Sequence, residues 1–408
     1  MMKTLLLSPS LPNKKSSGGI MICDLLSLVK EDEIFAFVAR DPHLKNVLIE
    51  KYPALSDIET IKRPIESPYS FPRWFFDKAL SRQIEKIKDF YIKWRVIRRA
   101  VRYGKRNGVE CVWAVLQGKT MIISALKVAK ALGVPLISQI WDEPKWILSD
   151  TGIDQKTKVK ILKIFGETVK ASKVCATASE PMAKKYQDKY RTKTVVFMGS
   201  LDAKMALSAA KRINYGNNLK IGFAGQLYAT SEWKALILAL DEVDWKIRGR
   251  RVTIHLLGGF GSSEMQNLPS NRVVNLGYKS QQQTIKILSK MDILYCPYWF
   301  DEEHRGIAKT SFPSKLTTYF AAGRPVFFHG PEYSSPAKFI RENKCGVLCH
   351  SLRSKDIVKQ FEELLSDRKR YSQITRAGRV AFDKYLTYGN LSNQLTVFLN
   401  IAKESISR

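Results

Sequence analysis

Residues 311–330 read SFPSKLTTYFAAGRPVFFHG and join a short helical pattern to an apolar strand pattern. The helical pattern begins at Lys315, although a positive charge is mildly unfavourable near a helix N-terminus. The lysine becomes favourable there if an anionic ligand lies between the helix end and its ammonium group. The stretch therefore predicts either an anion site or the ordinary alternative, a Ser314 cap followed by a solvated lysine.

Hydroxyl side chains gather just before this helix. Thr310, Ser311 and Ser314 precede Lys315, and Pro313 fixes the backbone conformation near the helix start. Free backbone N–H groups, hydroxyls and one ammonium group together form a site suited to a diphosphate. We therefore expect a diphosphate to bind at this point.

Outside this stretch, short apolar runs alternate with amphipathic segments along most of the chain. The runs lie at residues 4–8, 34–39, 111–117, 136–141, 173–179, 194–199, 220–225, 252–258, 272–277, 292–298 and 325–330. Most are continuously apolar, as parallel strands buried on both faces are. Amphipathic stretches such as 120–132 and 231–243 separate them. This alternation predicts an α/β fold with crossover helices.

The strand pattern is interrupted near residues 200–218 and restarts at Lys220. We therefore expect α/β architecture in two Rossmann-like, doubly wound domains that face a central cleft, residues 1–205 and 206–384. Ligands of such sheets bind outside the carboxyl ends of the strands.

The 408-residue chain is strongly basic, with 67 Lys and Arg against 38 Asp and Glu and a formal net charge of +29. Such an excess predicts an anionic partner: nucleic acid, an acidic membrane surface or phosphorylated substrates. Much of it lies in residues 73–106, which hold twelve basic and three acidic residues.

Segment 73–106 also has a helical apolar stripe. The stripe consists of Leu80, Ile84, Ile87, Tyr91, Trp94, Ile97 and Val101. One interpretation is a crossover helix whose stripe packs on the core while its cations are solvated. The other is a surface that docks on anionic lipid. In that case, the residues expected to enter the membrane interface are Arg73, Trp74, Phe75 and Phe76.

The cysteines and the N-terminus indicate a cytoplasmic protein. Six scattered cysteines are expected to be buried free thiols. Cys345, Cys349 and His350 lack a nearby second ligand pair, so zinc is not expected. The N-terminal MMKTLLLSPSLP predicts a buried strand rather than a secretory signal, and no apolar run of 18 residues predicts a membrane span.

The run FPSKLTTYFAAGRPV, residues 312–326, resembles the donor-binding motif of GT-B glycosyltransferases, especially glycosyltransferase family 4, with its pattern P-S-K-L-x-E-Y-x-A-x-G-x-P-V. The similarity extends over the chain. Further similar segments are LLLSPSLPNKKSSGG (5–19), ISQIWDEP (137–144), ASKVCATASEPMAKKY (171–186), KIGFAGQLY (220–228), HLLGGFG (255–261) and VVNLGYKS (273–280).

The resemblance implies transfer of a sugar from a nucleotide-diphosphate sugar that the C-terminal domain mainly holds. Lys315 then pairs with the donor phosphates, with Ser311 and Ser314 beside them. Gly225 and Gln226 begin the loop under the diphosphate.

Three further positions follow from the same resemblance. Tyr278 lies near the nucleotide base. Gly18 and Gly19 let an N-terminal glycine-rich loop approach the phosphates, which glycine permits because it lacks a Cβ. The last helix, within residues 385–408, returns to the N-terminal domain.

Two positions depart from the family pattern. Thr310 and Thr318 stand where the family commonly has one glutamate near the sugar and one on the ribose. Threonine hydrogen-bonds one hydroxyl but does not accept two as a carboxylate does. Weaker ribose binding, a different donor, or replacement by Glu302 or Glu303 all remain open. After the Gly225 loop, only Lys234 is a candidate for the family's basic residue.

The resemblance also implies a mechanism. No Asp-x-Asp motif stands at a strand end, so no metal cofactor is expected and Lys315 stabilises the departing diphosphate. The sugar is transferred with retention, and the leaving phosphate takes the acceptor's proton. Asp142 is the candidate acceptor contact or auxiliary base; the alternative is a turn aspartate before Pro144. His304 is a rival for this role, although a lone loop histidine is commonly just exposed.

The sequence thus predicts a metal-independent, hexosyltransferase-type glycosyltransferase with a glycan or lipid-linked acceptor, acting in cell-surface polysaccharide or glycolipid biosynthesis. We expect it in the cytoplasm, peripheral on the inner face of an anionic membrane. The alternative is a catalytically degenerate GT-B scaffold that binds a nucleotide sugar. A nucleic-acid-binding protein is the less favoured alternative and no nucleic acid partner is expected, because no recognisable binding module accompanies the cations.

Overall fold

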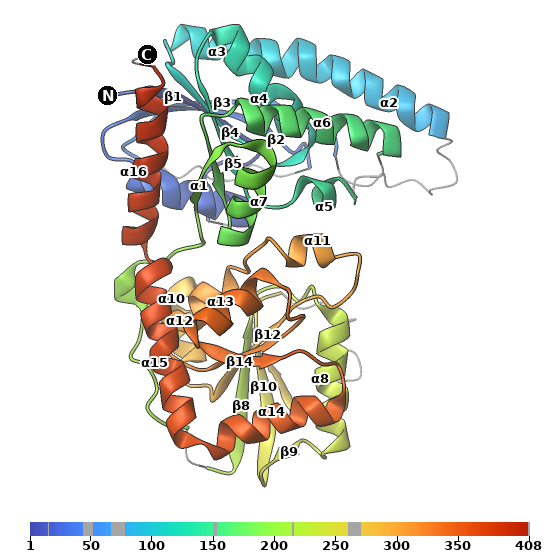
Figure 1. The fold of residues 1–408 in the computed structure, drawn as a ribbon, viewed down its shortest axis with the longest axis vertical. Helices are drawn as coiled ribbons and strands as arrows, with labels where there is room; N and C mark the ends of the chain where they lie inside the picture. The colour runs from blue at the N-terminus through green and yellow to red at the C-terminus, as the bar shows by residue number, and fades with distance from the viewer. Residues whose placement is uncertain are drawn as a thin grey trace. The chain divides into compact units, whose positions relative to one another are not determined.

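The computed structural model describes residues 1–14, 16–43, 52–66, 78–149, 153–213, 216–259 and 271–406. The chain divides into two compact units (Figure 1). The N-terminal unit comprises residues 1–197 together with 391–408, and the C-terminal unit comprises residues 198–390. The first boundary thus lies eight residues before the expected residue 205.

The N-terminal unit is built on a parallel sheet of seven described strands. They are β1 (Lys3–Ser8), β2 (Glu33–Arg40), β3 (Leu55–Lys62), β4 (Cys111–Val115), β5 (Leu136–Ile140), β6 (Val174–Thr177) and β7 (Lys193–Val196). Their order in the sheet is β3-β2-β1-β4-β5-β6-β7. Every residue of β4 and β5 is buried, as the continuous apolar runs predict.

The sheet of the C-terminal unit likewise has seven described strands. They are β8 (Asn218–Ala224), β9 (Lys246–Ile247), β10 (Arg250–Leu257), β11 (Val273–Asn275), β12 (Ile293–Pro297), β13 (Val326–His329) and β14 (Gly346–Cys349). The parallel strands are ordered β11-β10-β8-β12-β13-β14, and β9 pairs antiparallel with β10. The prediction of two α/β units with doubly wound parallel sheets is confirmed.

Helices connect the strands in both units. Those of the N-terminal unit are α1 (Ser17–Leu28), α2 (Lys78–Tyr91), the π-helix η2 (Ile92–Ile97), α3 (Arg98–Arg106), α4 (Gly118–Leu132), α5 (Pro144–Ser149), α6 (Gln155–Ala171) and α7 (Glu180–Tyr190). The C-terminal unit has η3 (Ala203–Met205), α8 (Thr230–Glu242), α10 (Gln281–Leu288), α11 (Arg305–Ala308), α12 (Lys315–Ala321), α13 (Ser335–Asn343), α14 (Ser354–Ser366) and α15 (Arg368–Tyr385). The last helix, α16 (Tyr388–Glu404), begins in the C-terminal unit and continues into the N-terminal unit.

Each sheet has one point at which the strand order reverses. In the N-terminal unit it lies between β1 and β4, and in the C-terminal unit between β8 and β12. Ligands of open α/β sheets bind at such switch points, outside the carboxyl ends of the strands. The loops after β1, β4, β8 and β12 are therefore where a site is expected.

Helix α16 packs on the N-terminal unit. Its buried residues Leu391, Leu395 and Phe398 belong to the same core cluster as Trp113 and Phe197. The Phe398 ring meets the rings of Trp113 and Phe197 edge-on, with centroids 5.4 and 5.2 Å apart. This apolar contact explains why residues 391–408 belong to the first unit.

Three strands have no counterpart among the predicted runs. Strand β3 has the sequence LSDIETIK and is a partly exposed edge strand, so it lacks a continuous apolar run. Strand β9 has only two residues, too few to show a pattern, and β14 alternates half-buried and buried positions rather than forming a continuously buried run. The six cysteines are buried and free, as expected. Within the described residues, none of the helices combines the length and apolar character needed to cross a bilayer.

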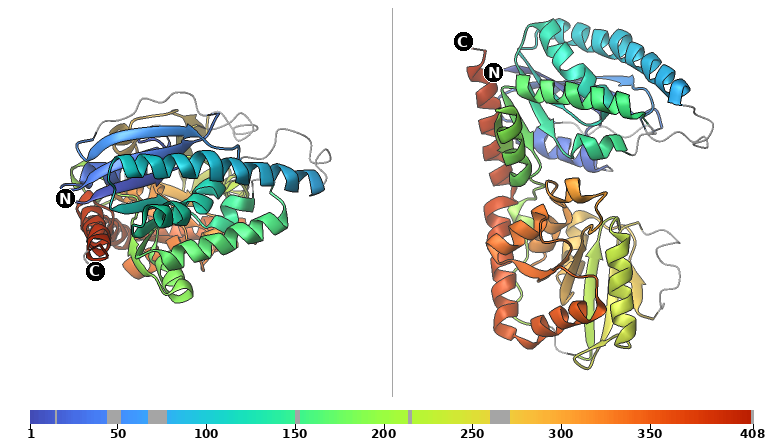
Figure 2. Two further views of the ribbon diagram at one scale, coloured as in Figure 1. Left: turned by 90° about the horizontal axis from the view of Figure 1, so that it is seen from above. Right: turned by 45° about the vertical axis from the view of Figure 1, so that its right-hand side comes forward.

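The basic segment is helical as predicted, and its apolar stripe packs on the core in part. Helices α2, η2 and α3 follow one another directly and form one long helix along the outside of the N-terminal unit (cyan in Figure 2). Of the stripe, Ile97 is buried and Tyr91 and Val101 pack against the same core, whereas Ile87 and Trp94 are exposed. Residues outside the stripe, Ile92, Val96 and Ala100, are buried beside them.

Candidate donor site at the end of strand β8

The β8 strand ends in a tight turn at Gly225. Gly225 has a φ of 94°, which glycine adopts without strain, and its N–H donates to the carbonyl of Leu257 at 2.8 Å. The backbone of Gly225 also approaches Gly258 so closely that a Cβ on Gly258 would lie 2.9 Å from the Gly225 carbonyl oxygen. Gly225 and Gln226 are exposed at the switch point of this sheet.

Lys315, the first residue of α12, reaches this turn. Its Nζ donates to the Gln226 carbonyl at 3.2 Å and lies 4.4 Å from the ring centroid of Phe223 and 4.3 Å from that of Tyr228. Among the described residues, no carboxylate pairs with this ammonium group. Burial between the two rings lowers the pKa of Lys315 to about 8.

The rest of α12 fixes the position of Lys315. One turn further on, the Tyr319 hydroxyl accepts from the Ala224 N–H at 2.9 Å and donates to the Tyr295 carbonyl at 3.1 Å. The Thr317 hydroxyl donates to the Gly199 carbonyl at 2.7 Å. Residues at i and i+4 share a helix face, so these bonds hold Lys315 against the end of β8.

The predicted hydroxyl residues differ in what they can offer a ligand. Ser314 is exposed and makes no capping hydrogen bond, so the alternative of a Ser314 cap with a solvated lysine is wrong. Ser311 is buried, and its carbonyl accepts from the Tyr298 hydroxyl at 3.1 Å. Thr310 is buried, and its hydroxyl donates to the Gly306 carbonyl at 3.1 Å.

Thr318, the second departure from the family pattern, lies next to helix α10. Its Oγ1 accepts from Nε2 of Gln281 at 2.8 Å. Tyr278 is 83% exposed and follows Gly277, which has a φ of 66°. A Cβ on Gly259 would lie 2.6 Å from the Tyr278 hydroxyl, so the phenol ring lies over the backbone after β10.

The acidic loop before α11 is occupied by local ion pairs. Glu302 pairs with Arg305 at 2.6 Å. His304 lies 2.6 Å from Asp301, and its ring stacks on Trp299 with centroids 4.8 Å apart. Lys234 is exposed on α8. The contacts with Asp301 and Trp299 give His304 a structural role in this loop.

A buried carboxylate near this loop escaped the sequence analysis. Glu232, on the first turn of α8, accepts from the Phe300 N–H at 2.8 Å. Burial raises its pKa above the ordinary range. It ties α8 to the loop after β12, and only the tertiary structure places the two together.

In the N-terminal unit, Gly18 and Gly19 lie in the first turn of α1 rather than in a loop. The Gly19 N–H donates to the Ser16 hydroxyl, which caps the helix, at 3.1 Å. A Cβ on Gly18 would lie 2.7 Å from the Trp141 ring, and one on Gly19 would lie 2.6 Å from the Asn13 carbonyl oxygen. Close packing within this unit therefore requires both glycines.

Asp142 follows β5 at the carboxyl end of the sheet and is half-buried. The next residue, Glu143, pairs with Lys185 of α7 at 2.8 Å. The four proposed membrane residues, Arg73, Trp74, Phe75 and Phe76, lie outside the described residues. Among the residues that are described, no three His, Cys, Asp or Glu side chains gather into a metal-binding group.

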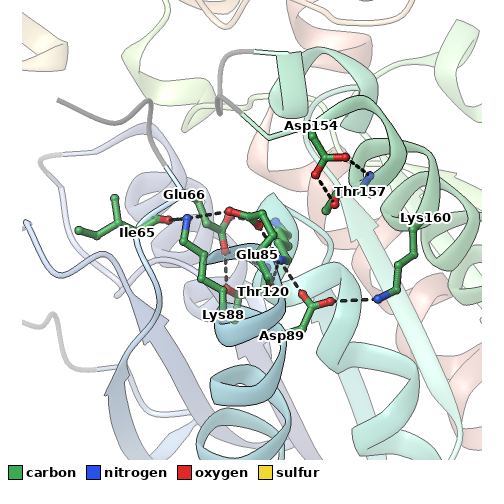
Figure 3. Close-up of polar contacts among 10 residues, drawn as sticks. Ile65, Glu66, Glu85, Lys88, Asp89, Thr120, Asp154, Thr157 and Lys160 are labelled. Carbon is green, nitrogen blue, oxygen red and sulfur yellow. Dashed lines mark hydrogen bonds and ion pairs between the residues drawn. The ribbon is translucent and has the colours of Figure 1, made fainter. Parts of the chain in front are cut away.

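A buried polar cluster lies after β4, at the switch point of the first sheet (Figure 3). The Glu66 carboxylate accepts from the N–H groups of Lys119 and Thr120 at 2.9 and 2.8 Å, and from the Thr120 hydroxyl. Lys119 pairs with Glu85 and Asp89 of α2, both at 2.6 Å. The Gly-Lys-Thr sequence at 118–120 directly after a buried strand is the signal that could have indicated this cluster.

Comparison with known proteins places this geometry in context. Residues 218–367 match the family described as Glycosyl transferases group 1. HepE from Anabaena, solved in complex with UDP-glucose, is 13% identical and is covered over 100% of its chain and 98% of this one, with a TM-score of 0.66. Sucrose-phosphate synthase from Thermosynechococcus elongatus is 11% identical over 98% of both chains, with a TM-score of 0.67.

A glycosyltransferase from Rickettsia africae is 13% identical over 99% of both chains, with a TM-score of 0.61. Comparison with curated proteins finds no match. At these identities, the structural likeness shows the fold alone. Residues 218–367 thus match the glycosyl transferases group 1 family, and the chain as a whole shares the fold of these GT-B glycosyltransferase structures.

Proposed function

We propose that this protein transfers a sugar from a nucleotide-diphosphate sugar to a glycan or lipid-linked acceptor. The observation that carries the proposal is the Lys315 ammonium, held without a carboxylate partner in the described structure over the exposed Gly225–Gln226 turn. A diphosphate at this turn supplies the missing negative charge. UDP-glucose is the first donor to test, because HepE, a structural neighbour, was solved with it.

In this proposal Lys315 acts on the leaving group. Breaking the glycosyl–phosphate bond places negative charge on the departing diphosphate and positive charge on the sugar ring. A fixed ammonium group stabilises that separation, so no metal cofactor is needed. The acceptor attacks the face that the diphosphate leaves, the leaving phosphate takes the acceptor's proton, and configuration is retained. Asp142 contacts the acceptor or assists as a base.

The nucleotide is held by the neighbouring positions. The exposed Tyr278 ring offers a surface on which the base stacks, and the Gln226 side chain and Ser314 hydroxyl are exposed beside the turn. Gly225 leaves the space that the diphosphate requires.

The acceptor belongs to cell-surface polysaccharide or glycolipid synthesis, and the enzyme works from the cytoplasm on an anionic membrane surface. The net charge of +29 and the basic helix α2–η2–α3 support a membrane location.

The experiment is a thermal-shift panel of UDP-, GDP-, ADP- and dTDP-sugars on the full chain, on Lys315→Ala and on Lys355→Ala. Lys355 is an exposed lysine of α14 and serves as the control. A ligand that binds only the native state stabilises it by about 2.7 kcal/mol at a hundredfold excess over its Kd. We expect one nucleotide class to shift the wild type and Lys355→Ala but not Lys315→Ala. An unchanged shift in Lys315→Ala contradicts the proposal.

The second candidate is a catalytically degenerate scaffold that binds a nucleotide sugar without turnover. Thr310 and Thr318 favour it, because both stand where the family has glutamates and the Thr310 hydroxyl donates to the Gly306 carbonyl. Donor-dependent release of nucleotide, with product anomers assigned by NMR, separates the two functions. Donor binding without any turnover on lipid-linked acceptors supports the scaffold.

A further inference from the structure

The helix α2–η2–α3 presents large apolar side chains to solvent. Ile87 is 69%, Phe90 61% and Trp94 44% exposed. At spacings of three and four residues they lie on one helix face, and the Phe90 and Trp94 rings contact each other with centroids 5.7 Å apart. An exposed apolar patch of this kind marks an interaction surface.

A buried ionic cluster sets this orientation. Glu85, at a core-facing position of α2, is 2% exposed and pairs with the buried Lys119 of α4. Asp89, one turn later, pairs with Lys119 and with Lys160 of α6 (Figure 3). Because Glu85 and Asp89 face inward, Ile87 and Phe90 face outward.

Beyond Trp94, the same long helix borders a basic pocket of about 550 Å³. Its arginines are Arg95, Arg98, Arg99, Arg102 and Arg106. Arg98 lies over the Trp94 ring, 3.6 Å from its centroid, so the apolar patch and the pocket are continuous.

The pocket has more positive than negative charge. Glu59 pairs with Arg99 at 2.5 Å, and Asp57 lies 3.4 Å from Arg106. Among the described residues, no carboxylate pairs with the remaining three arginines, Arg95, Arg98 and Arg102. Tyr103 also lines the pocket, and burial together with the nearby Asp57 carboxylate raises the pKa of its hydroxyl above the ordinary value. Guanidinium groups without a carboxylate partner suit a phosphate group.

We propose that this face docks on an anionic membrane, with lipid phosphate headgroups in the arginine pocket and Ile87, Phe90 and Trp94 in the interface. A lipid surface is the occupant that offers phosphate and hydrocarbon side by side. Nucleic acid offers phosphate but has no hydrocarbon layer into which the aliphatic Ile87 side chain could insert. The inference rests on the membrane location proposed above and uses residues separate from the donor site.

The test is co-sedimentation of the full chain with vesicles of one part phosphatidylglycerol to two parts phosphatidylcholine. The variant Arg95→Gln/Arg98→Gln/Arg102→Gln removes the three unpaired arginines. Its control, Lys355→Gln/Lys369→Gln/Arg376→Gln, removes the same charge from exposed positions of α14 and α15. Each arginine near an anionic surface contributes enough that losing three weakens binding about a hundredfold. The control is expected to bind as the wild type does.

A second pair of variants tests the apolar patch. Phe90→Ser/Trp94→Ser removes two exposed rings, and Leu238→Ser/Val380→Ser removes exposed apolar side chains elsewhere. We expect only the first to weaken vesicle binding, by about tenfold or more, and to abolish the part that persists at high salt. Circular dichroism and thermal melting of each variant confirm folding.

Several results overturn the proposal. They are equal binding of the wild type to pure phosphatidylcholine vesicles, an equal loss in the matched controls, and unchanged binding of the arginine variant. Binding of a DNA duplex that the arginine variant loses, without vesicle binding by the wild type, assigns the pocket to nucleic acid and rejects the lipid. Failure of the donor site is distinguishable, because Lys315→Ala should still bind vesicles and the arginine variant should still bind the donor.

Discussion

At the scale of single residues, Lys315 departs most from its ordinary chemistry. Its ammonium group is enclosed by the Phe223 and Tyr228 rings and lacks a carboxylate partner among the described residues, and burial lowers its pKa to about 8. A donor diphosphate would restore the preference for the charged form. Binding of the donor and protonation of Lys315 are therefore linked.

We expect the affinity for UDP-glucose, or for the donor found in its place, to fall about tenfold between pH 7 and pH 9. Below pH 8 the lysine is already charged in the free protein, whereas above pH 8 binding must first take up a proton. Isothermal titration calorimetry in buffers of different ionisation enthalpy measures both the affinity and the proton uptake. Lys315→Arg stays charged throughout and should lose the pH dependence. A tenfold fall that persists in Lys315→Arg assigns the titration to another group.

Thr318 tests the missing glutamate of the family pattern. We expect Thr318→Glu to tighten nucleotide binding about tenfold, because a carboxylate accepts two ribose hydroxyls through charge-assisted hydrogen bonds. Thr318→Glu also removes the hydrogen bond that Gln281 donates to the Thr318 hydroxyl, so Gln281→Ala alone serves as the control. Calorimetry with UDP measures the effect. Unchanged affinity in Thr318→Glu would mean that the ribose does not reach this position.

At the scale of elements, the long helix α2–η2–α3 is held by a buried ion pair in addition to the apolar packing of Ile92, Val96 and Ile97. Burial alone would raise the pKa of Glu85, but hydrogen bonds and charge from Lys119 and Lys88 outweigh it and lower the pKa below the ordinary value. The ionised Glu85 therefore stabilises the fold above about pH 4.5. This contribution is lost as the pH falls through the lowered pKa.

Glu85→Gln is expected to lower the free energy of unfolding by about 3 kcal/mol at pH 7, because it removes one of the two carboxylates that pair with the buried Lys119, each at 2.6 Å. The difference from the wild type should shrink at pH 3, where Glu85 is increasingly protonated. Urea unfolding at both pH values measures it. Asp188→Asn removes an exposed ion pair of α7 and should change the free energy by about 1 kcal/mol or less at both. A difference that stays constant between pH 7 and pH 3 would show that Glu85 stabilises the helix by packing alone.

At the scale of the whole molecule, each unit has its own sheet and core, and each sheet has one switch point. The candidate donor residues lie at the β8 end of the second sheet, and the Glu66–Lys119–Thr120 cluster lies after β4 of the first. The helix α16 completes the core of the N-terminal unit although it follows the whole C-terminal unit in sequence.

Phe398→Ala should destabilise the N-terminal unit by about 3–5 kcal/mol, because it leaves a cavity beside Trp113 and Phe197. The matched variant Val397→Ala changes an exposed neighbour and should have little effect. Differential scanning calorimetry follows the unfolding transitions of the units. Lowering of every transition by the same amount would contradict an effect confined to one unit.

The sequence by itself determined the features that depend on local pattern. Continuous apolar runs such as 111–117 and 325–330 identified most of the strands, because parallel strands are buried on both faces. The motif around Lys315 identified the start of α12, because proline, serine and glycine set helix ends locally. It also indicated a donor site, which stays a prediction until a ligand is tested.

The tertiary structure decided what depends on partners distant in sequence. Ile87 and Trp94 are exposed although Ile97 of the same helical stripe is buried, and Glu85 faces the core, where it pairs with Lys119. The edge strand β3 escaped notice because an edge strand needs no continuous apolar run. The pKa of Lys315 is low because the Phe223 and Tyr228 rings, about ninety residues earlier in the chain, enclose its ammonium group. The sequence shows only a lysine after a serine and does not reveal these neighbours.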